Sequence, residues 1–163
     1  MDPRALAEEA SYIEIKRCGK PIGKQDQYAA AYGGFNIIRF NKAYNEVVPI
    51  TMSKYDLFAN LMMFDTGLTR ETSSILGEHV EKIKSGVNIR LLDSMKDIAE
   101  LAIKCLGNKK IDDFGALLDH TWETKKQLSS AVSTPFIDEC YEKAKKAGAL
   151  GGKILGAGGG GFL

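Results

Sequence analysis

The run from Gly156 to Gly161 constrains this chain most, because five of its six residues are glycine. Glycine loses more backbone freedom on folding than any other residue, so such a run needs a conformational reason. One reason is an anion site, because backbone N–H groups without neighbouring Cβ atoms can turn inward around a phosphate. The alternative is a flexible linker. Linkers are usually bounded by polar residues, whereas apolar pairs flank this run on both sides, and we therefore favour a phosphate-binding loop.

Two common phosphate loops do not fit this run. It is not a Walker A loop, because no Gly-Lys-Ser or Gly-Lys-Thr follows it. It is not a dinucleotide-binding fingerprint either, because no second βα unit with an acidic residue follows it. A phosphate site here therefore belongs to a different kind of fold.

A second candidate site lies at Asp26, which stands between Gln25 and Gln27 and close to Lys24. A carboxylate can accept or orient the proton of a hydroxyl that attacks a phosphate. A nearby cation can keep the carboxylate ionised and stabilise the charge on the phosphate. The alternative is an ordinary carboxylate at a helix start, where the helix dipole favours acidic residues. A single aspartate does not decide between these interpretations.

The pattern of apolar residues, glycines and prolines predicts an α+β chain, with helices on one face of a mostly antiparallel sheet. Helices are expected over residues 2–17 and 23–32, the first capped by Asp2. Three amphipathic stripes predict further helices between residues 69 and 148, with Pro135 at the start of the last one.

Strands are expected where β-branched and aromatic residues gather between turn residues. The expected strands cover residues 35–40, 47–52 and 153–155, and a returning strand begins at residues 162–163. The continuous apolar run of residues 61–64 predicts a buried central strand.

Charge and cysteine content exclude several classes of partner. The 22 Lys and Arg residues nearly balance the 21 Asp and Glu residues, so neither nucleic acid nor a membrane surface is predicted as a partner. Three widely spaced cysteines predict neither a disulfide framework nor a zinc site, and no metal ligands are proposed. Neither a signal-peptide pattern nor an apolar run near the ~20 residues of a membrane span is present, so we expect a cytoplasmic protein.

Two cations stand where a phosphate could bind. Lys125 lies on the otherwise apolar stripe of Trp122 and Leu128, so its amine either snorkels to the edge or enters a polar cleft. Arg70 closely follows the apolar run of residues 61–64, where binding residues often lie, and a surface arginine at a helix start is the alternative. Both cations could contact a phosphate group.

Taken together, these segments resemble the GHMP kinases, a family that includes galactokinase, homoserine kinase and mevalonate kinase. The run of residues 156–161 is similar to the family's C-terminal glycine-rich loop, and residues 23–27 are similar to its Gly-x-x-Asp-Gln segment. Longer strings look like the branch that phosphorylates D-glycero-D-manno-heptose 7-phosphate. They are residues 22–36, 64–70 and 151–163.

The resemblance implies an ATP-dependent sugar kinase that acts with Mg²⁺ on a hydroxyl of a sugar or sugar phosphate. It implies that Asp26 is the base or orienting carboxylate, and that Lys24 contributes a neighbouring charge. It also implies that the glycine loop places backbone amides near the reacting phosphate or sugar. The loop residues concerned are Gly156, Gly158, Gly159, Gly160 and Gly161.

The resemblance further implies two domains. Residues 1–50 are expected to be a remnant of the family's N-terminal, ribosomal protein S5 domain 2-like domain, and residues 51–163 its ferredoxin-like C-terminal domain. The family's main ATP phosphate loop, Pro-x-x-x-Gly-x-x-Ser-Ser followed by Ser or Ala, is absent from this sequence. We therefore expect the chain to be inactive alone.

Two alternatives remain open for the chain as it stands. It could be a non-catalytic sugar-phosphate-binding or regulatory module on the same scaffold, or a structural fragment without ligand affinity. An incomplete N-terminal domain would also expose an apolar face, so a homodimer is a further expectation.

Overall fold

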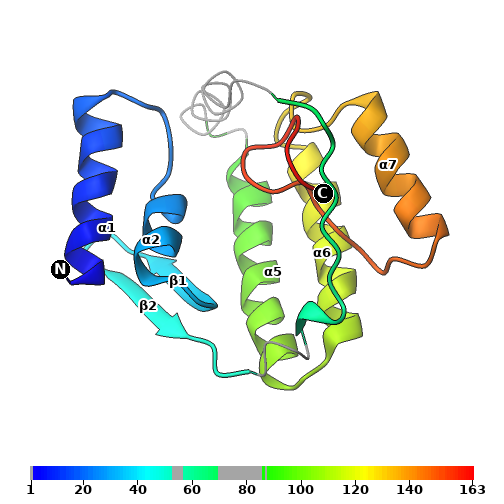
Figure 1. Cartoon of the computed structure of the whole chain (residues 1–163), viewed down its shortest axis with the longest axis horizontal. Coiled ribbons are helices and arrows are strands. Elements are labelled where there is room, and N and C mark those ends of the chain that lie inside the picture. The colour runs from blue at the N-terminus through cyan, green and yellow to red at the C-terminus, as the bar shows by residue number, and fades with distance from the viewer. Residues whose placement is uncertain (1, 53–56, 70–85, 87) are drawn as a thin grey trace. The chain divides into compact units, whose positions relative to one another are not determined.

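The computed structural model describes residues 2–52, 57–69, 86 and 88–163 (Figure 1). The chain divides into two compact units, residues 1–51 and residues 52–163. Each unit is described by itself below.

The first unit begins with two helices. Helix α1 (Pro3–Tyr12) is capped by Asp2, whose carboxylate accepts the N–H of Ala5 at 3.3 Å, as the sequence predicts. The helix continues into a π-helical turn, η1 (Ile13–Arg17), because the N–H of Cys18 donates to the carbonyl of Ile13 five residues back. Helix α2 (Gln25–Tyr32) ends at Gly33, whose φ of +60° suits glycine.

A hairpin completes the first unit. Strands β1 (Asn36–Phe40) and β2 (Asn45–Pro49) pair antiparallel. Strand β2 begins at Asn45, slightly before the predicted strand of residues 47–52. Tyr28 of α2 is fully buried and meets the ring of Phe40 edge-on, with ring centroids 5.3 Å apart. Asn45 donates to the Tyr28 hydroxyl at 2.6 Å, which ties the hairpin to the helix.

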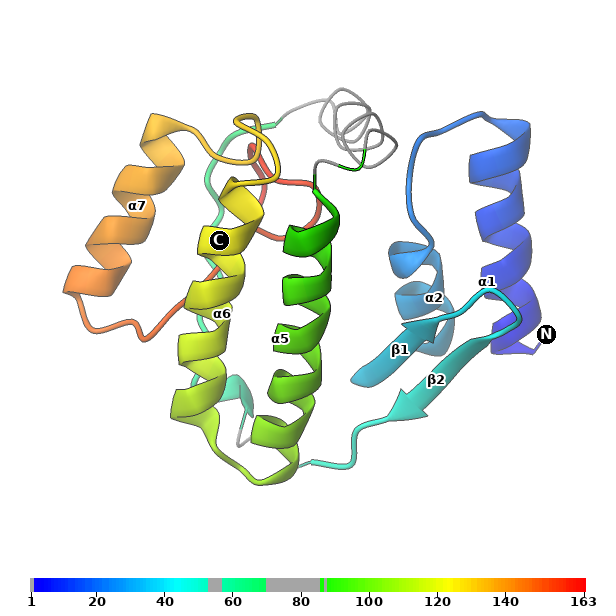
Figure 2. The same ribbon diagram turned by 180° about the vertical axis from the view of Figure 1, so that it is seen from behind.

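The second unit contains three well-defined helices in its described part. They are α5 (Ile89–Gly107), α6 (Ile111–Lys126) and α7 (Pro135–Lys146). Helices α5 and α6 lie side by side in both views (Figures 1 and 2). Helix α7 starts as predicted, with Pro135 in its first turn and the Thr134 hydroxyl accepting the N–H of Ile137 at 3.2 Å.

The core of the second unit lies between α6, α7 and the segment that enters the glycine loop. Its buried members are Trp122, Val132, Ile137, Tyr141 and Ile154, and Leu68 and Leu163 pack against them. The predicted apolar stripes of α6 and α7 therefore supply three of these five side chains.

The expectation of a buried central strand at residues 61–64 is wrong. The four side chains are 43%, 82%, 66% and 54% exposed, and the described structure assigns no strand to them. The backbone of Phe64 exchanges two hydrogen bonds of 2.9 Å with Leu163, and Asp65 forms an isolated antiparallel bridge with Phe162. An apolar run indicates burial only where neighbouring elements cover it. In the described structure, these hydrogen bonds place only the short segment of residues 162–163 beside the run.

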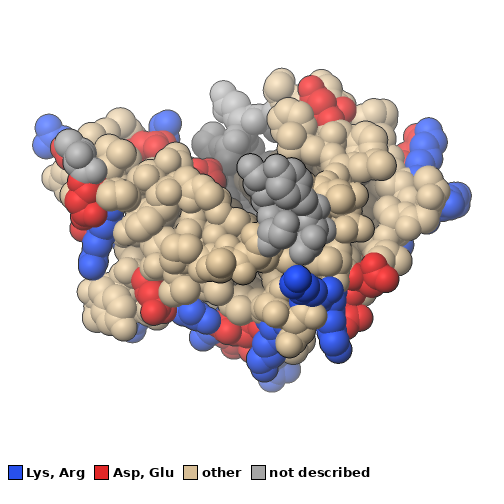
Figure 3. Space-filling view, turned by 60° about the horizontal axis from the view of Figure 1, so that its bottom comes forward, with Lys and Arg blue, Asp and Glu red and all other residues tan. Residues whose placement is uncertain are grey.

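The observed fold is therefore α+β, with helices and a small two-stranded antiparallel sheet among the described residues. Basic and acidic side chains are interspersed on the face shown in Figure 3, in keeping with the balanced composition. No helix in the described ranges is both long enough and apolar enough to cross a membrane.

Candidate functional site

Glycine is required in the glycine loop because the loop passes very close to two other backbone segments. A Cβ atom at Gly158 would lie 2.6 Å from the carbonyl oxygen of Val132, and the φ of Gly158 is +108°. A Cβ atom at Gly160 would lie 2.5 Å from the carbonyl oxygen of Leu68. Since ordinary Cβ contacts are longer than 3.0 Å, neither position accepts a side chain without a backbone shift.

Alternate amides of the loop anchor it to the unit. The N–H of Gly159 donates to Val132 at 2.7 Å, and the N–H of Gly161 donates to Leu68 at 2.9 Å. Within the described residues, the amides of Gly156, Gly158 and Gly160 have no acceptor. Of the five loop glycines that were expected to donate to a ligand, only these three have an N–H group available. The N–H groups of Gly159 and Gly161 already donate within the chain.

Lys125 contacts the first residue of the loop. It is only 8% exposed on α6, and its amine donates to the carbonyl of Gly156. Burial lowers the pKa of Lys125 to about 8, and the nearby charge of Lys153 adds to this effect. The side chain does not snorkel to the edge of the helix, because its amine is held by the loop.

Lys153 is a second lysine at this place, and the sequence interpretation missed it. It directly precedes the buried Ile154, and burial lowers its pKa. No hydrogen bond or ion pair holds its amine within the part of the chain that the structure describes. A lysine directly before an apolar pair and a glycine run was the signal that could have identified it.

The lowered pKa of Lys125 predicts that the stability of the fold depends on pH. Its pKa is about 8 in the folded chain, against 10.5 for a lysine amine exposed to water, so between these values the unfolded chain binds more protons. The free energy of unfolding should therefore rise from about pH 8 to pH 10, by at most about 1.4 kcal/mol per pH unit for one proton. Urea unfolding at several pH values measures this slope.

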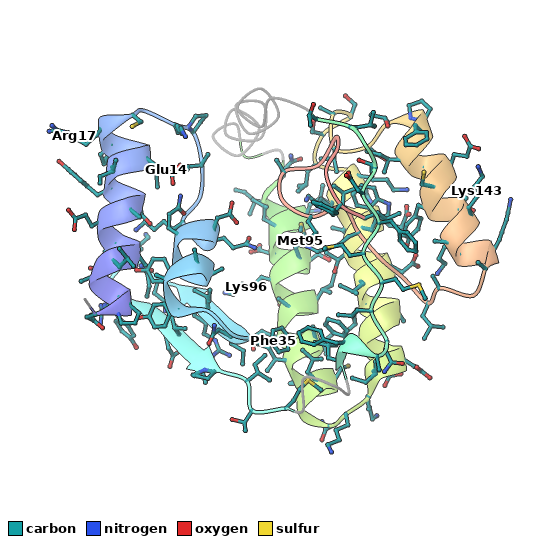
Figure 4. The ribbon with its side chains drawn as sticks, in the orientation of Figure 1. Glu14, Arg17, Phe35, Met95, Lys96 and Lys143 are labelled. Atoms are coloured by element: carbon teal, nitrogen blue, oxygen red, sulfur yellow. The ribbon has the colours of Figure 1, made fainter. Side chains whose placement is uncertain are left out.

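A matched pair of variants assigns the slope to Lys125. Lys125→Met should flatten the rise. Lys143→Met should leave it in place, because Lys143 is exposed on α7 and Glu139 raises its pKa (Figure 4). Equal slopes in the parent and in Lys125→Met would contradict the assignment.

Asp26 lies in the first turn of α2, with its side chain exposed. It lines a hollow of about 350 Å³ in the first unit. The other lining residues are Leu6, Ala10, Glu14, Gln27, Ala30 and Ala31. A small polar group next to Asp26 would therefore meet a mainly apolar wall with two further polar side chains.

Gln27 and Glu14 form the polar edge of this hollow. Gln27 is buried and donates to the carboxylate of Glu14 at 2.8 Å, and Glu14 lies on the side of the first helix that faces α2 (Figure 4). This hydrogen bond, aided by Lys20, lowers the pKa of Glu14 against the opposing effect of burial. The carbonyl oxygen of the Gln27 side chain is buried without a partner in the described structure.

Lys24 lines a different hollow from Asp26, although the sequence places them together. Lys24 directly precedes α2 and borders a hollow of about 320 Å³, which is also lined by Arg4, Tyr12 and Lys42. No ion pair joins Lys24 to Asp26 in the described ranges. Their proximity in sequence therefore does not create a carboxylate–ammonium pair here.

The other predicted residues fall in different places. Arg70 lies outside the described residues. Asp26 and Lys24 belong to the first unit, and the glycine loop and Lys125 belong to the second. Among the described side chains, no three His, Cys, Asp or Glu residues gather in a way that could hold a metal ion.

One protein-family model matches the C-terminal part of the second unit. Residues 102–163 match the family model described as "GHMP kinases C terminal". The matched region contains α6, α7 and the whole glycine loop.

Two curated relatives are kinases by name. The chain is 36% identical over 165 residues to the D-glycero-alpha-D-manno-heptose 7-phosphate kinase of Campylobacter jejuni, covering 97% of this chain and 48% of that protein. It is 29% identical over 149 residues to the L-fucokinase/L-fucose-1-P guanylyltransferase of Bacteroides fragilis, covering 86% and 16% respectively. The chain thus spans about half the length of the first relative and a smaller share of the second.

Two solved structures share the fold. The L. major mevalonate kinase in complex with R-mevalonate matches with a TM-score of 0.70 and 23% identity, over 85% of this chain and 42% of that one. A D-glycero-D-manno-heptose 1-phosphate kinase from Bacteroides thetaiotaomicron matches with a TM-score of 0.60 and 25% identity, over 96% of this chain and 42% of that one.

Proposed function

Because this chain belongs to the GHMP kinase family, we propose that it is part of an ATP-dependent sugar kinase. The proposed acceptor is a hydroxyl of a sugar phosphate, with D-glycero-D-manno-heptose 7-phosphate as the first candidate. The observation that carries this proposal is the 36% identity to a heptose 7-phosphate kinase over 97% of the chain.

Asp26 is the proposed base or orienting carboxylate for the sugar hydroxyl. Its exposed position at the start of α2 leaves its oxygens open to a substrate, and no hydrogen bond within the described chain occupies them. As the hydroxyl oxygen attacks the γ-phosphorus of ATP, Asp26 would accept the hydroxyl proton, and the bond to the ADP oxygen would break. Lys24 is retained as a nearby positive charge rather than as an ion-pair partner.

The glycine loop is the proposed phosphate-binding element. The free amides of Gly156, Gly158 and Gly160 could donate to phosphate oxygens, while Gly159 and Gly161 hold the loop in place. Lys125 stabilises the loop by donating to the carbonyl of Gly156. Arg70 remains a proposed contact to the phosphate of the sugar. ATP would arrive with Mg²⁺, which neutralises phosphate charge, but we assign no metal ligands in this chain.

We assign residues 1–50 to the remnant of the N-terminal domain and residues 51–163 to the ferredoxin-like C-terminal domain. The division into compact units at residues 51 and 52 supports this boundary. A homodimer would cover the exposed apolar side chains of residues 61–64. A kinase of this kind would act in the cytoplasm, where ATP is abundant.

A non-catalytic module that binds sugar phosphate is the second candidate. Such a module would use the same loop amides of Gly156, Gly158 and Gly160, which have no acceptor among the described residues, without phosphate transfer. ADP release with heptose 7-phosphate, measured for this chain and for a longer form with the serine-rich loop, separates the candidates. We expect turnover by the longer form alone. Sugar-phosphate binding by both forms, with no turnover by either, would favour the binding module.

A further inference from the structure

A carboxylate of α6 joins three parts of the second unit shortly before the glycine loop begins. Asp119 accepts the hydroxyl of Tyr141, a buried residue of α7. The amine of Lys145, in the last turn of α7, lies 3.3 Å from the same carboxylate oxygen. Lys145 also donates to the carbonyl of Leu150 at 2.8 Å. This Asp119 cluster (Asp119, Tyr141 and Lys145) therefore links α6 to α7 and to the segment that follows α7.

The segment of residues 150–152 lies directly against α6 beside this cluster. A Cβ atom at Gly151 would lie 2.6 Å from the backbone nitrogen of Asp119, so no side chain separates the segment from the helix. A Cβ atom at Gly152 would meet the ring of Tyr141 at 3.6 Å. The segment is thus held between α6 and Tyr141, and Lys145 is bonded to its first residue.

The same segment leads into the glycine loop after a few residues. Ile154 is fully buried in the core with Trp122 and Tyr141, and the loop begins two residues later at Gly156. Close-packed interiors transmit strain because they have little empty space in which to absorb it. A shift of residues 150–152 should therefore reach the loop.

Asp119 supplies the negative charge for both of its partners. The hydrogen bond from Tyr141 lowers the pKa of Asp119 against the opposing effect of burial, and Lys145 lowers it further, so the carboxylate stays ionised at neutral pH. The side chains of Lys145 and Asp119 are 33% and 36% exposed, so their ion pair alone contributes little. The charge-assisted hydrogen bond from the buried Tyr141 is the stronger of the two contacts.

We propose that Asp119 is a positioning residue for the glycine loop, because through Tyr141 and Lys145 it fixes residues 150–152 and thereby the placement of the loop. The role rests on the proposed function only for what the loop binds. Asp119 itself need not contact a substrate, since its two partners carry its effect to the segment that enters the loop.

Hydrogen exchange of the loop amides in the 163-residue chain tests this role without any kinase activity. The N–H groups of Gly159 and Gly161 donate to Val132 and Leu68, so they exchange when the loop opens locally. We expect Asp119→Ala to speed their exchange about tenfold or more, the size of losing a hydrogen bond to a charged group. Asp119→Asn should retain most of the protection, because its amide oxygen can still accept from both partners.

Tyr141→Phe is a second variant that keeps the core filled. It removes only the hydroxyl that donates to Asp119, and it should also speed exchange of the two loop amides. Added to Asp119→Ala it should change little more, because the hydroxyl has then already lost its acceptor. Glu139→Ala is the matched control. It removes another ion pair of α7, to Lys143 at 2.7 Å, and should leave the loop amides at the parent's rate.

An amide of α5, such as that of the buried Ile98, separates positioning from general stability. The emission of Trp122, the chain's only tryptophan and fully buried, verifies that each variant is folded. If Asp119 only stabilised the helices, the loop would open without disturbing the Asp119 cluster. Faster exchange in α5 with unchanged loop amides, in both Asp119→Ala and Tyr141→Phe, would therefore overturn the proposal.

Turnover by the longer form distinguishes failure of this role from failure of the kinase assignment. If the longer form transfers phosphate, Asp119→Ala should lower kcat/KM about tenfold or more, because a displaced loop misaligns the reacting groups. Glu139→Ala should match the parent. Unchanged kcat/KM and unchanged loop exchange in Asp119→Ala would end the positioning role while the kinase assignment stands. No transfer by the longer form, with faster loop exchange in Asp119→Ala, would end the kinase assignment instead.

Discussion

Replacement of Asp26 by alanine is expected to lower the rate of phosphate transfer to heptose 7-phosphate at least ~100-fold, the low end for loss of a positioned acid–base group. The rate is measured as ADP release by a longer form that contains this chain. Because Asp26 is exposed and makes no hydrogen bond within the described chain, its removal should lower the unfolding free energy by no more than the helix-dipole interaction of a first-turn carboxylate, about 0.3–1 kcal/mol. The expected loss is therefore one of chemistry rather than of folding.

Glu9→Ala provides the matched control for Asp26→Ala. Glu9 is also an exposed carboxylate of the first unit, but it does not line the hollow at Asp26. The control should retain the parent's turnover. Turnover by Asp26→Ala within a few-fold of the parent would remove Asp26 from the proposed mechanism.

The second large effect is expected at Gly151, where the chain that enters the glycine loop crosses α6. A Cβ atom at this position would lie 2.1 Å from the carbonyl oxygen of Gly115 and 2.6 Å from the backbone nitrogen of Asp119. Helix backbone cannot yield as a flexible side chain can, so Gly151→Ala must push this segment away from α6. We expect a loss of about 3 kcal/mol in unfolding free energy, the upper range for overpacking.

Gly152→Ala tests whether the effect at Gly151 is steric. A Cβ atom at Gly152 would meet a ring carbon of Tyr141 at 3.6 Å, which is an ordinary contact. Urea unfolding should therefore place Gly152→Ala within about 0.5 kcal/mol of the parent, as for substitutions away from special features. Equal destabilisation by the two variants would contradict the packing of this segment against α6.

Local chemistry made several features of the fold predictable from sequence. The Asp2 cap and the Pro135 helix start depend on residues only a few positions away, and both are observed. The need for glycine in the loop was also evident. The reason for glycine at positions 158 and 160 is that the backbone there passes close to Val132 and Leu68. These contacts join residues distant in sequence, so only the structure could reveal them.

Burial was the property that sequence predicted least well. The apolar run of residues 61–64 was expected inside but is exposed, whereas Lys125 is a charged residue that is only 8% exposed. Burial depends on which elements pack over a residue, and a residue's own polarity decides this only on average. Lys153 was missed for the same reason, since a lysine beside an apolar pair is normally a surface residue.

The most direct test of the kinase assignment is identification of the phosphorylated product. A longer form that contains this chain is incubated with ATP labelled at the γ-phosphate and heptose 7-phosphate, and the products are separated and analysed by mass spectrometry. We predict a heptose that carries a second, labelled phosphate ester, formed in equal amount to ADP. Labelled inorganic phosphate as the only product, or no loss of label from ATP, would contradict the assignment.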